Sequence, residues 1–293
     1  MVAEDLGETD AFALAGPEPV EGWRAFARGL VAELTAAGVE LVPARISVSG
    51  DVPLGSGLSS SAALESALCL ALLGVAGAEE PDRIELAKLC SRVENEWVGA
   101  ETGLLDQLAS LLGAEGHALR IDFATLSIER VPLDLRGWQL VTVDSGAAHE
   151  HAASGYNERR AECEAAAHAL GVTTLSAATL DAAERLPEPG RRRARHVLTE
   201  NARVDATVDA LRRGDLEAVG RLLDESHASL RDDYDSSVEE VEGAVERLKR
   251  TGAAGARMMG GGFGGAVLAL LAPGAALPAG ATAVVPGPPA RRL

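Results

Sequence analysis

Apolar and polar positions recur along this chain in two rhythms, one typical of helices and one typical of strands. In residues 21–37 the apolar side chains lie three and four positions apart, which predicts an amphipathic helix that ends at Gly38. Residues 40–49 alternate like a strand and lead directly into a turn rich in glycine and serine. Helical spacing predicts further helices at about 59–76, 82–98, 103–113, 155–170, 175–184, 188–213, 215–230 and 236–251.

Strand-like runs cover residues 117–132 and 137–144, and the apolar run AVLALLA follows a glycine-rich turn near the C-terminus. The last 20 residues are rich in Pro, Gly and Ala, and we expect them to form a poorly ordered tail. Helices and strands mix without a regular βαβ repeat, which predicts an α+β fold. Near residue 118 the predicted elements change from mostly helices to strands followed by helices. This change predicts two lobes, residues 1–118 and 119–293, with the site between them.

Composition narrows the classes of partner. The formal net charge of −17 argues against a nucleic-acid backbone or an anionic membrane as partner, because both would repel the protein. The three cysteines are widely spaced and form no Cys-x-x-Cys pair, so neither a zinc site nor a disulfide framework is predicted. The start of the chain has no basic segment followed by an apolar core, and no apolar run is long enough for a membrane span. We therefore expect a cytoplasmic protein.

The segment DVPLGSGLSSSAALESAL, residues 51–68, carries the strongest chemical signal. Glycines and serines that lead into a helix present backbone N–H groups and hydroxyls at its N-terminus, where the helix dipole favours negative charge. A phosphate chain is the natural ligand of such a turn. The alternative is an ordinary helix N-terminus, in which one serine caps the helix. Three consecutive serines favour the phosphate site, because one cap needs only one hydroxyl.

Two other nucleotide-binding motifs are excluded. The chain contains no G-x-x-x-x-G-K-[ST], so it is not a P-loop protein. Gly260, Gly262 and Gly265 match G-x-G-x-x-G in form, but they precede a strand-like run, and no Asp or Glu follows residue 265. A dinucleotide-binding fingerprint follows a strand, opens a helix and has an acidic residue about 20 positions later.

Five segments in order resemble the GHMP kinases, and three of them resemble the galactokinase branch of that family. PLGSGLSSSAALE is similar to the second family motif, the loop over the nucleotide phosphates, and GARMMGGGFGGAV is similar to the third. The branch is indicated by ENEWVGAETGLLDQLASLLG, HAASGYNERRAECEAAA and SHASLRDDYDSSVEEVE. The resemblance implies a two-lobed GHMP kinase fold with the active site between the lobes.

The resemblance also implies a site for ATP and Mg²⁺. The residues that would hold the ATP phosphates are Gly55, Ser56, Gly57, Leu58, Ser59, Ser60 and Ser61. The Ser61 hydroxyl and the Glu94 carboxylate would be ligands of Mg²⁺, which prefers hard oxygen donors beside substrate phosphates. The alternative for Glu94 is a solvated helix face, since glutamate is mostly exposed in proteins.

The resemblance also implies which residues of this chain contact the sugar. Asp106 would lie at the C1 hydroxyl of the sugar as proton acceptor or orienting group, and its apolar neighbours in sequence predict that it is partly buried. Gly103 and Tyr156 would contact the sugar, although Tyr156 is also consistent with half-buried packing. Trp23 aligns with an aromatic residue near the adenine, and core packing is the alternative there.

The match has gaps. The first motif of the branch, of the GRVNLIGEHTDYNGG type, has no counterpart here, so we expect the N-terminal lobe to be incomplete and to lack an arginine and a Glu-His-Asp set. Met259 stands where the family usually has Thr, and Ala266 where it often has Cys.

The resemblance implies ATP-dependent phosphorylation of α-D-galactose at C1, by a monomer. The alternatives are a catalytically dead protein that binds nucleotide or acts as a sensor, and a kinase of another sugar or small alcohol.

Overall fold

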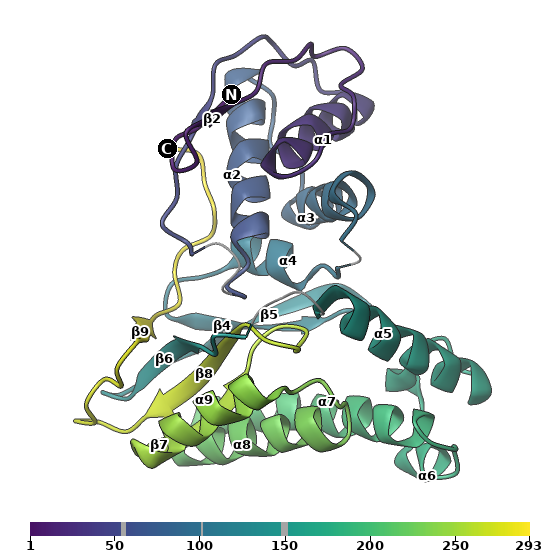
Figure 1. Ribbon diagram of the computed structural model, residues 1–293, viewed down its shortest axis with the longest axis vertical. Helices are drawn as coiled ribbons and strands as arrows, with labels where there is room; N and C mark the ends of the chain where they lie inside the picture. The colour runs from purple at the N-terminus through teal and green to yellow at the C-terminus, as the bar shows by residue number, and fades with distance from the viewer. Residues whose placement is uncertain (54–56, 101, 148–151) are drawn as a thin grey trace.

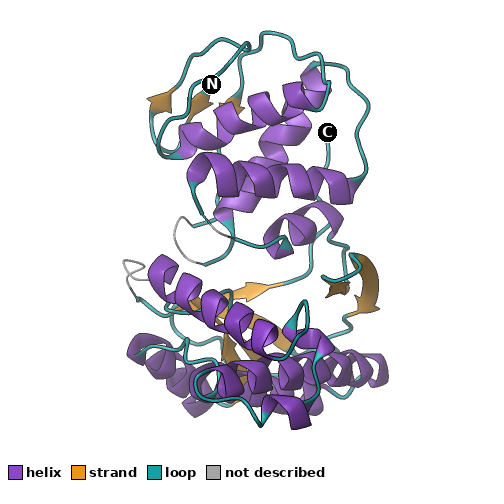
Figure 2. Cartoon of the chain, turned by 90° about the vertical axis from the view of Figure 1, so that its right-hand side faces the viewer, coloured by secondary structure: helices purple, strands orange, loops and turns teal. Residues whose placement is uncertain are grey.

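The computed structural model describes residues 1–53, 57–100, 102–147 and 152–293. Two layers of different composition lie one above the other (Figures 1 and 2). The upper one, which we call the helical layer, consists mainly of α1 (Trp23–Ala36), α2 (Ser60–Val75), α3 (Arg83–Arg92) and α4 (Leu105–Leu112). The lower one, the sheet layer, contains the larger sheet and the remaining helices. The mixture confirms the predicted α+β class.

The helical layer is built around α2. Its sequence, SSAALESALCLALLGV, is apolar on nearly all sides, as expected of a helix surrounded by others. It packs against α1, α3 and α4, and the shared core is a cluster of buried leucines. The largest of these side chains are Leu30, Leu34, Leu68, Leu73, Leu86, Leu108 and Leu111.

A small sheet lies at the edge of the helical layer. Strand β1 (Val2–Ala3) pairs antiparallel with β2 (Glu8–Thr9) and parallel with β3 (Ser47–Val48). The strand predicted over residues 40–49 is therefore only two residues long, because the preceding segment is bound by few backbone hydrogen bonds. The two short N-terminal strands were not predicted, since residues 1–18 show no alternation.

The sheet layer contains a hairpin and a four-stranded antiparallel sheet. The hairpin joins β4 (His117–Asp122) and β5 (Ser127–Pro132). The sheet has the order β7-β8-β6-β9, formed by β6 (Gln139–Asp144), β7 (Ala253–Met258), β8 (Ala266–Leu271) and β9 (Ala281–Val284). The helices of this layer are α5 (Ala152–Ala169), the 3₁₀ turn Leu175–Ala177, α6 (Leu180–Ala183), α7 (Gly190–Arg213), α8 (Leu216–Asp232) and α9 (Glu239–Arg250).

The C-terminal segment corrects one expectation. Predicted as a poorly ordered tail, it instead adds β9 to the sheet, where Thr282 lies opposite Thr142. It then returns to the helical layer, where the Ala290 N–H donates to the Ser110 carbonyl at 2.8 Å and Arg292 donates to the Ala78 carbonyl at 3.1 Å. The prediction was wrong because Pro and Gly content does not by itself produce disorder, and the short run ATAV suits an edge strand.

The boundary between the predicted lobes, residues 118 and 119, falls at the start of β4 and stays a prediction. The chain crosses between the layers there and again after β9 (Figure 1). None of the described helices combines the length and the apolar character that a bilayer crossing needs.

Helix α8 approaches β7 so closely that two glycines are required at the contact. A Cβ atom built on Gly255 would lie 1.8 Å from the carbonyl oxygen of Gly220, and no L side chain fits there. Both glycines are buried. The strand that leads to the glycine-rich turn is therefore held by direct backbone contact with a helix.

This contact predicts opposite effects for two Gly→Ala substitutions. Gly255→Ala should lower the free energy of unfolding by about 1–3 kcal/mol or more, because α8 or β7 must shift. Gly243→Ala, in the interior of α9 with no contact nearer than 3.5 Å, should raise it by up to about 1 kcal/mol through helix propensity. Urea denaturation of both variants measures this. Equal effects of the two substitutions would contradict the close approach.

Candidate functional site

The N-terminus of α2 has no side-chain cap from Ser59. Ser59 precedes the helix in the left-handed region, with φ 58° and ψ 44°, and its side chain makes no capping hydrogen bond. Gly57 also has a positive φ, of 73°. The first amides of the helix therefore lack the hydrogen bond that an ordinary serine N-cap would supply. Gly55 and Ser56, two of the predicted phosphate-binding residues, lie outside the described residues, whereas Gly57, Leu58, Ser59, Ser60 and Ser61 are described.

The two glycine-rich motifs are in contact. A Cβ atom on Gly57 would lie 3.1 Å from the backbone nitrogen of Ala266 and 3.1 Å from Cα of Gly265. The turn that contains Gly265 links β7 to β8, and it is closed by a hydrogen bond from the Met259 N–H to the Ala266 carbonyl at 2.9 Å. The start of α2 and this turn thus form one surface from residues far apart in sequence.

Helix α5 brings Tyr156 to the same turn. The Tyr156 ring lies so close to Gly261 that a Cβ atom there would be 2.7 Å from it, and the Phe263 ring packs on Gly155 in the same way at 2.6 Å. Tyr156 is half-buried. Tyr156, which the sequence predicts to contact the sugar, therefore packs on the glycine-rich turn. The structure is consistent with both a sugar contact and a packing role for this side chain.

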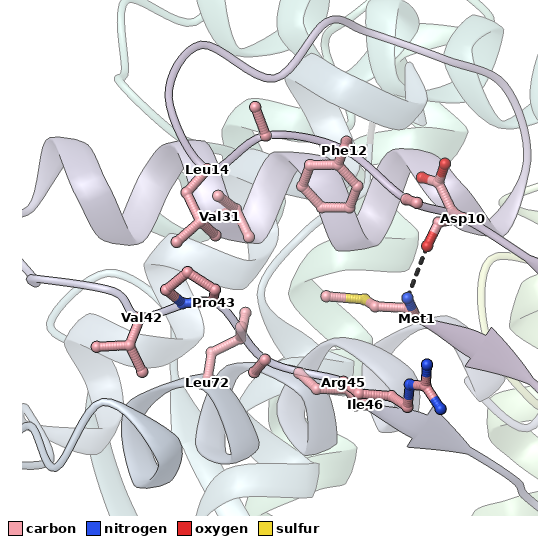
Figure 3. A pocket seen from close by; sticks show the side chains of 13 residues that line it. Met1, Asp10, Phe12, Leu14, Val31, Val42, Pro43, Arg45, Ile46 and Leu72 are labelled. Atoms are coloured by element: carbon pink, nitrogen blue, oxygen red, sulfur yellow. Dashed lines mark hydrogen bonds between the residues drawn. The ribbon is translucent and has the colours of Figure 1, made fainter.

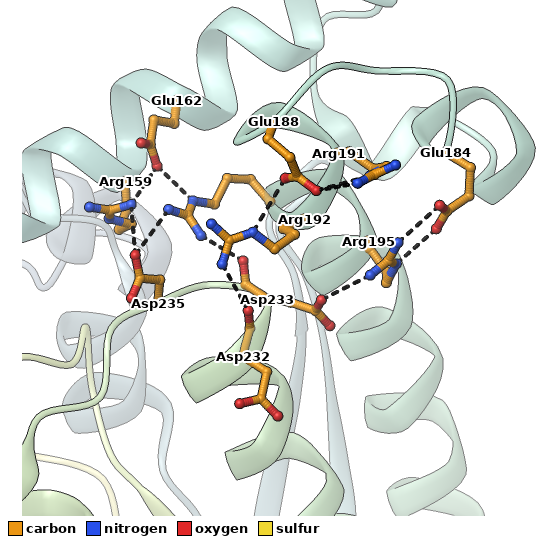
Figure 4. Close-up of polar contacts among 11 residues, drawn as sticks. Arg159, Glu162, Glu184, Glu188, Arg191, Arg192, Arg195, Asp232, Asp233 and Asp235 are labelled. Atoms are coloured by element: carbon orange, nitrogen blue, oxygen red, sulfur yellow. Dashed lines mark hydrogen bonds and ion pairs between the residues drawn. The ribbon is translucent and has the colours of Figure 1, made fainter.

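A charged network holds α5 and the turn in place (Figure 4). The buried Arg193 side chain on α7 donates to Glu162 Oε2 at 2.6 Å and to the Asp233 carbonyl at 2.7 Å. Arg159, on α5, donates to the other side of the same Glu162 oxygen at 2.8 Å. The loop that carries Asp233 continues to Ser236, whose carbonyl accepts from the Phe263 N–H at 2.7 Å. The network therefore ties α5, α7 and the glycine-rich turn to one another.

Glu94 lies on the buried side of an unusual helix. The sequence predicts one helix over 82–98, but in the structure α3 ends at Arg92 and continues as a π-helix, Val93–Val98. Such wide turns are frequent at functional sites. Glu94 is only 7% exposed and its Oε2 accepts from Thr102 Oγ1 at 2.7 Å and from Gln107 Nε2 at 2.8 Å. The alternative of a solvated helix face is therefore excluded.

Glu65 is a buried carboxyl group that the sequence reasoning did not identify. It is fully buried on α2, and Gln107 Nε2 donates to its Oε2 at 3.1 Å. Burial raises the pKa of Glu65 to about 8, and the nearby charges of Glu94 and Asp106 add to this rise. The available signal was a single glutamate within the otherwise apolar run SSAALESALCLALLGV.

Asp106 is exposed, which corrects the expectation of partial burial. Gln107, Leu108 and Leu111 form the inner side of α4 and are buried, while Leu105 and Asp106 lie on its outer side. The apolar neighbours in sequence misled the prediction because a helix rotates adjacent residues onto different faces. Gly103 is also exposed, with open space around it. In Figure 1, α4 forms the lower end of the helical layer, which faces the sheet layer.

Two cavities of similar size lie in the helical layer. The first, about 380 Å³, is lined by Met1, Phe12, Leu14, Val31 and Leu72 among others, and none of the predicted site residues borders it (Figure 3). The second, about 350 Å³, is bordered by Ser60 at the start of α2, by Trp23 and by the apolar side chains of Val48, Val52 and Leu64. Its apolar wall beside a helix N-terminus suits a flat ring attached to phosphates.

The described side chains include no group of three or more His, Cys, Asp or Glu residues able to hold a metal ion. A single carboxylate, Glu94, and the Ser61 hydroxyl near the helix N-terminus remain as possible ligands. Such a sparse donor set does not fit a metal held by protein groups alone. It fits Mg²⁺, which keeps several waters and is often bound by one or two carboxylates together with phosphates of the substrate.

Comparison with known proteins matches both layers. Residues 24–114 match the description "GHMP kinases N terminal domain", and residues 207–284 match "GHMP kinases C terminal". The chain is 44% identical over 259 residues to a galactokinase of Thermotoga neapolitana, covering 88% of this chain and 74% of the relative. It is 46% identical over 261 residues to a galactokinase of Mycobacterium bovis, covering 87% and 72%. The crystal structure of Lactococcus lactis galactokinase complexed with galactose has a TM-score of 0.83 and 33% identity, covering 92% of this chain and 73% of that one.

The buried carboxyl group of Glu65 predicts a pH-dependent stability difference. Its pKa is raised in the folded state, so the stability it contributes is complete below the unfolded-state pKa, about 4.3, and is lost as pH rises to about 8. Glu65→Gln cannot ionise, so its stability relative to the wild type should increase with pH across this window, by at most about 1.4 kcal/mol per pH unit.

Thermal and urea unfolding between pH 4.5 and 8.5 measure this difference. Glu246→Gln is the matched control, because Glu246 is exposed on α9 and the same substitution there should change stability little at any pH. A constant offset between Glu65→Gln and the wild type across the range would contradict the protonated state.

Proposed function

This chain belongs to the GHMP kinase family, and on that premise we propose that it transfers the γ-phosphoryl group of ATP to the C1 hydroxyl of galactose. The identity with named galactokinases over most of the chain is the observation that carries the proposal. The chain is thus an ATP-dependent sugar kinase. A protein that binds nucleotide without catalysis is not favoured, since both named relatives are enzymes.

ATP would bind across the start of α2. Its adenine would occupy the apolar cavity beside Trp23, and its phosphates would meet the uncapped amides and hydroxyls from Gly57 to Ser61. Gly55 and Ser56 complete the predicted loop. The close contact of Gly57 with Gly265 supports this arrangement, because it brings the glycine-rich turn against the phosphate loop.

Mg²⁺ would be held by the Ser61 hydroxyl and the Glu94 carboxylate together with the phosphates. When bound, the ion would neutralise the negative charge that develops on the phosphate oxygens. Both hydrogen bonds that Glu94 accepts from Thr102 and Gln107 go to its Oε2, and neither uses Oε1. The protein's own contribution is therefore to hold one carboxylate still at the edge of the phosphate site.

Galactose would bind between the exposed start of α4 and the glycine-rich turn. Asp106 would accept the proton of the C1 hydroxyl. The oxygen of that hydroxyl would bond to the γ-phosphorus, and the bond from the γ-phosphorus to the bridging oxygen of ADP would break. Gly103 leaves room for close backbone contact, and Tyr156 would contact the sugar from α5. Because phosphoryl transfer passes through a loose transition state, positioning and charge neutralisation supply most of the catalysis.

Turnover with ATP and galactose tests the proposal. We expect release of ADP in equal amount to a sugar phosphate, identified as the 1-phosphate by ³¹P NMR, with glucose as the comparison sugar. The assay is run on this chain and on a version extended by any upstream in-frame codons. If neither protein forms a sugar phosphate while both bind ATP, the kinase proposal fails.

Asp106→Asn should abolish most of the turnover while ATP binding is kept. The amide cannot accept the proton, so we expect kcat to fall by about 100-fold or more. The dissociation constant for ATP, measured by calorimetry, should stay within about 2-fold, because the change leaves the phosphate loop untouched. Asp181→Asn, at an exposed position on α6, is the matched control. Full activity of Asp106→Asn would remove this residue from the mechanism.

A further inference from the structure

One buried amide joins two carboxyl groups at the inner face of α4. Gln107 is fully buried, and its Nε2 donates both to Glu94 Oε2 at 2.8 Å and to Glu65 Oε2 at 3.1 Å. A side-chain amide carries two N–H groups on that nitrogen, so each can serve one carboxyl group. Gln107 therefore spans the space between the π-helix that carries Glu94 and the helix α2 that begins at the phosphate loop.

The orientation of this amide is determined by its neighbours. If the amide were turned over, its carbonyl oxygen would face the Glu94 carboxylate, and the hydrogen bond from Gln107 to Glu94 would be replaced by repulsion between two acceptors. In the observed orientation Gln107 Oε1 and Glu65 Oε1 are buried without a hydrogen-bond partner among the described residues. Each buried unpaired atom of this kind costs about 1–3 kcal/mol. An apolar residue at 107 would remove the cost of Gln107 Oε1 but would also leave Glu65 Oε2 without its described donor, so the glutamine is explained by its two carboxyl partners and not by packing alone.

The position of Gln107 links it to the reacting groups. It follows Asp106 directly on α4, and the carboxylate it binds, Glu94, is also held by Thr102, the residue before Gly103. Without the amide, Glu94 Oε2 would keep a single described hydrogen bond, from an exposed threonine. A carboxylate held by one bond can rotate, whereas two donors on the same oxygen restrict it.

We propose that Gln107 is a positioning residue, braced by Glu65, that orients the Glu94 carboxylate toward the metal–nucleotide complex. The proposal rests on the proposed function, since it takes Glu94 as a ligand of the metal. Gln107 itself touches neither substrate nor metal. Its loss should therefore weaken the metal site and leave the sugar site nearly unchanged.

Gln107→Met tests the proposal, because methionine has a similar length and shape but no N–H donor. Leu111→Met is the matched control, since Leu111 is equally buried on α4 and makes no contact in this network. The first readout is the affinity for Mn²⁺ in the presence of a non-hydrolysable ATP analogue, followed by electron paramagnetic resonance of free Mn²⁺. We expect Gln107→Met to weaken this affinity by about 10–100-fold, the range typical for partners of metal ligands.

The second readout separates positioning from a structural role. The Mg²⁺ concentration for half-maximal turnover should rise with the loss of Mn²⁺ affinity, while KM for galactose stays within about 2-fold. As a single substitution, Glu65→Gln keeps an acceptor for the Gln107 amide and should retain nearly wild-type metal affinity, whereas Glu65→Leu should weaken it. If Gln107→Met does not fold, Gln107→Asn serves in its place, because its amide is too short to reach both carboxyl groups.

The two proposals fail in different ways. A folded Gln107→Met protein with wild-type Mn²⁺ affinity would overturn the positioning role even if the wild type phosphorylates galactose. Equal losses in Gln107→Met and Leu111→Met would also overturn it. A wild-type protein that binds Mn²⁺–nucleotide but phosphorylates no sugar would overturn the proposed function, and the Mn²⁺ comparison would still decide the role of Gln107.

Discussion

The site depends on a backbone contact between two glycine-rich segments that lie far apart in sequence. Gly57 lies against Gly265 and the backbone of Ala266, where a Cβ atom at 3.1 Å from both would make a tight contact, and its positive φ of 73° disfavours any other residue. The elements of the site meet at this contact: α2 begins beside it, β8 leaves from it, and Tyr156 and Phe263 pack on the same turn. Hydrophobic burial holds each layer together, but steric fit between backbones determines how the phosphate loop meets the turn.

The two sides of the site are supported by different forces. On the sheet side, the turn is held by ion pairs and charge-assisted hydrogen bonds around the buried Arg193, whose partners come from α5 and the loop before α9. On the helical side, support comes from hydrogen bonds of one amide, Gln107, to the carboxyl groups of Glu94 and Glu65, between α2, α4 and the π-helix. A buried arginine with several partners gives a rigid base. In the carboxyl–amide cluster opposite, Glu65 Oε1 and Gln107 Oε1 have no described hydrogen-bond partner. These unpaired atoms lower the stability of the fold, while the cluster fixes the position of the Glu94 carboxylate.

The sequence predicted the helices well, because their apolar spacing is regular and long. Helices α1, α2, α7 and α9 begin and end within a few residues of the prediction. The short strands were missed or misjudged, since two-residue strands and the run ATAV have too little pattern to stand out. The monomeric state and the cytoplasmic location stay predictions.

For the site, the motifs pointed to Gly57, Glu94 and Tyr156, and the structure brings the segments that carry them around the start of α2. What pattern reasoning could not supply was orientation. Glu94 follows Ala87 and Cys90 at helical spacing and is buried, Asp106 is turned outward by helical rotation, and the residue types alone indicate neither orientation. Glu65 and Gln107 were missed for a related reason, since one polar residue on an apolar helix shows its role only when its partner on another helix is known.

The return of the C-terminal segment to the helical layer bears on when the protein completes its folding during synthesis. Arg83 and Arg292 make hydrogen bonds to carbonyl groups more than 200 positions away, at Ala290 and Ala78. Strand β9 likewise pairs with β6, which is translated far earlier. Contacts of such long range form late, because the intervening chain must be ordered first. The edge of the helical layer and the outer edge of the sheet must therefore wait, unpaired on the ribosome, until residues 281–292 have emerged.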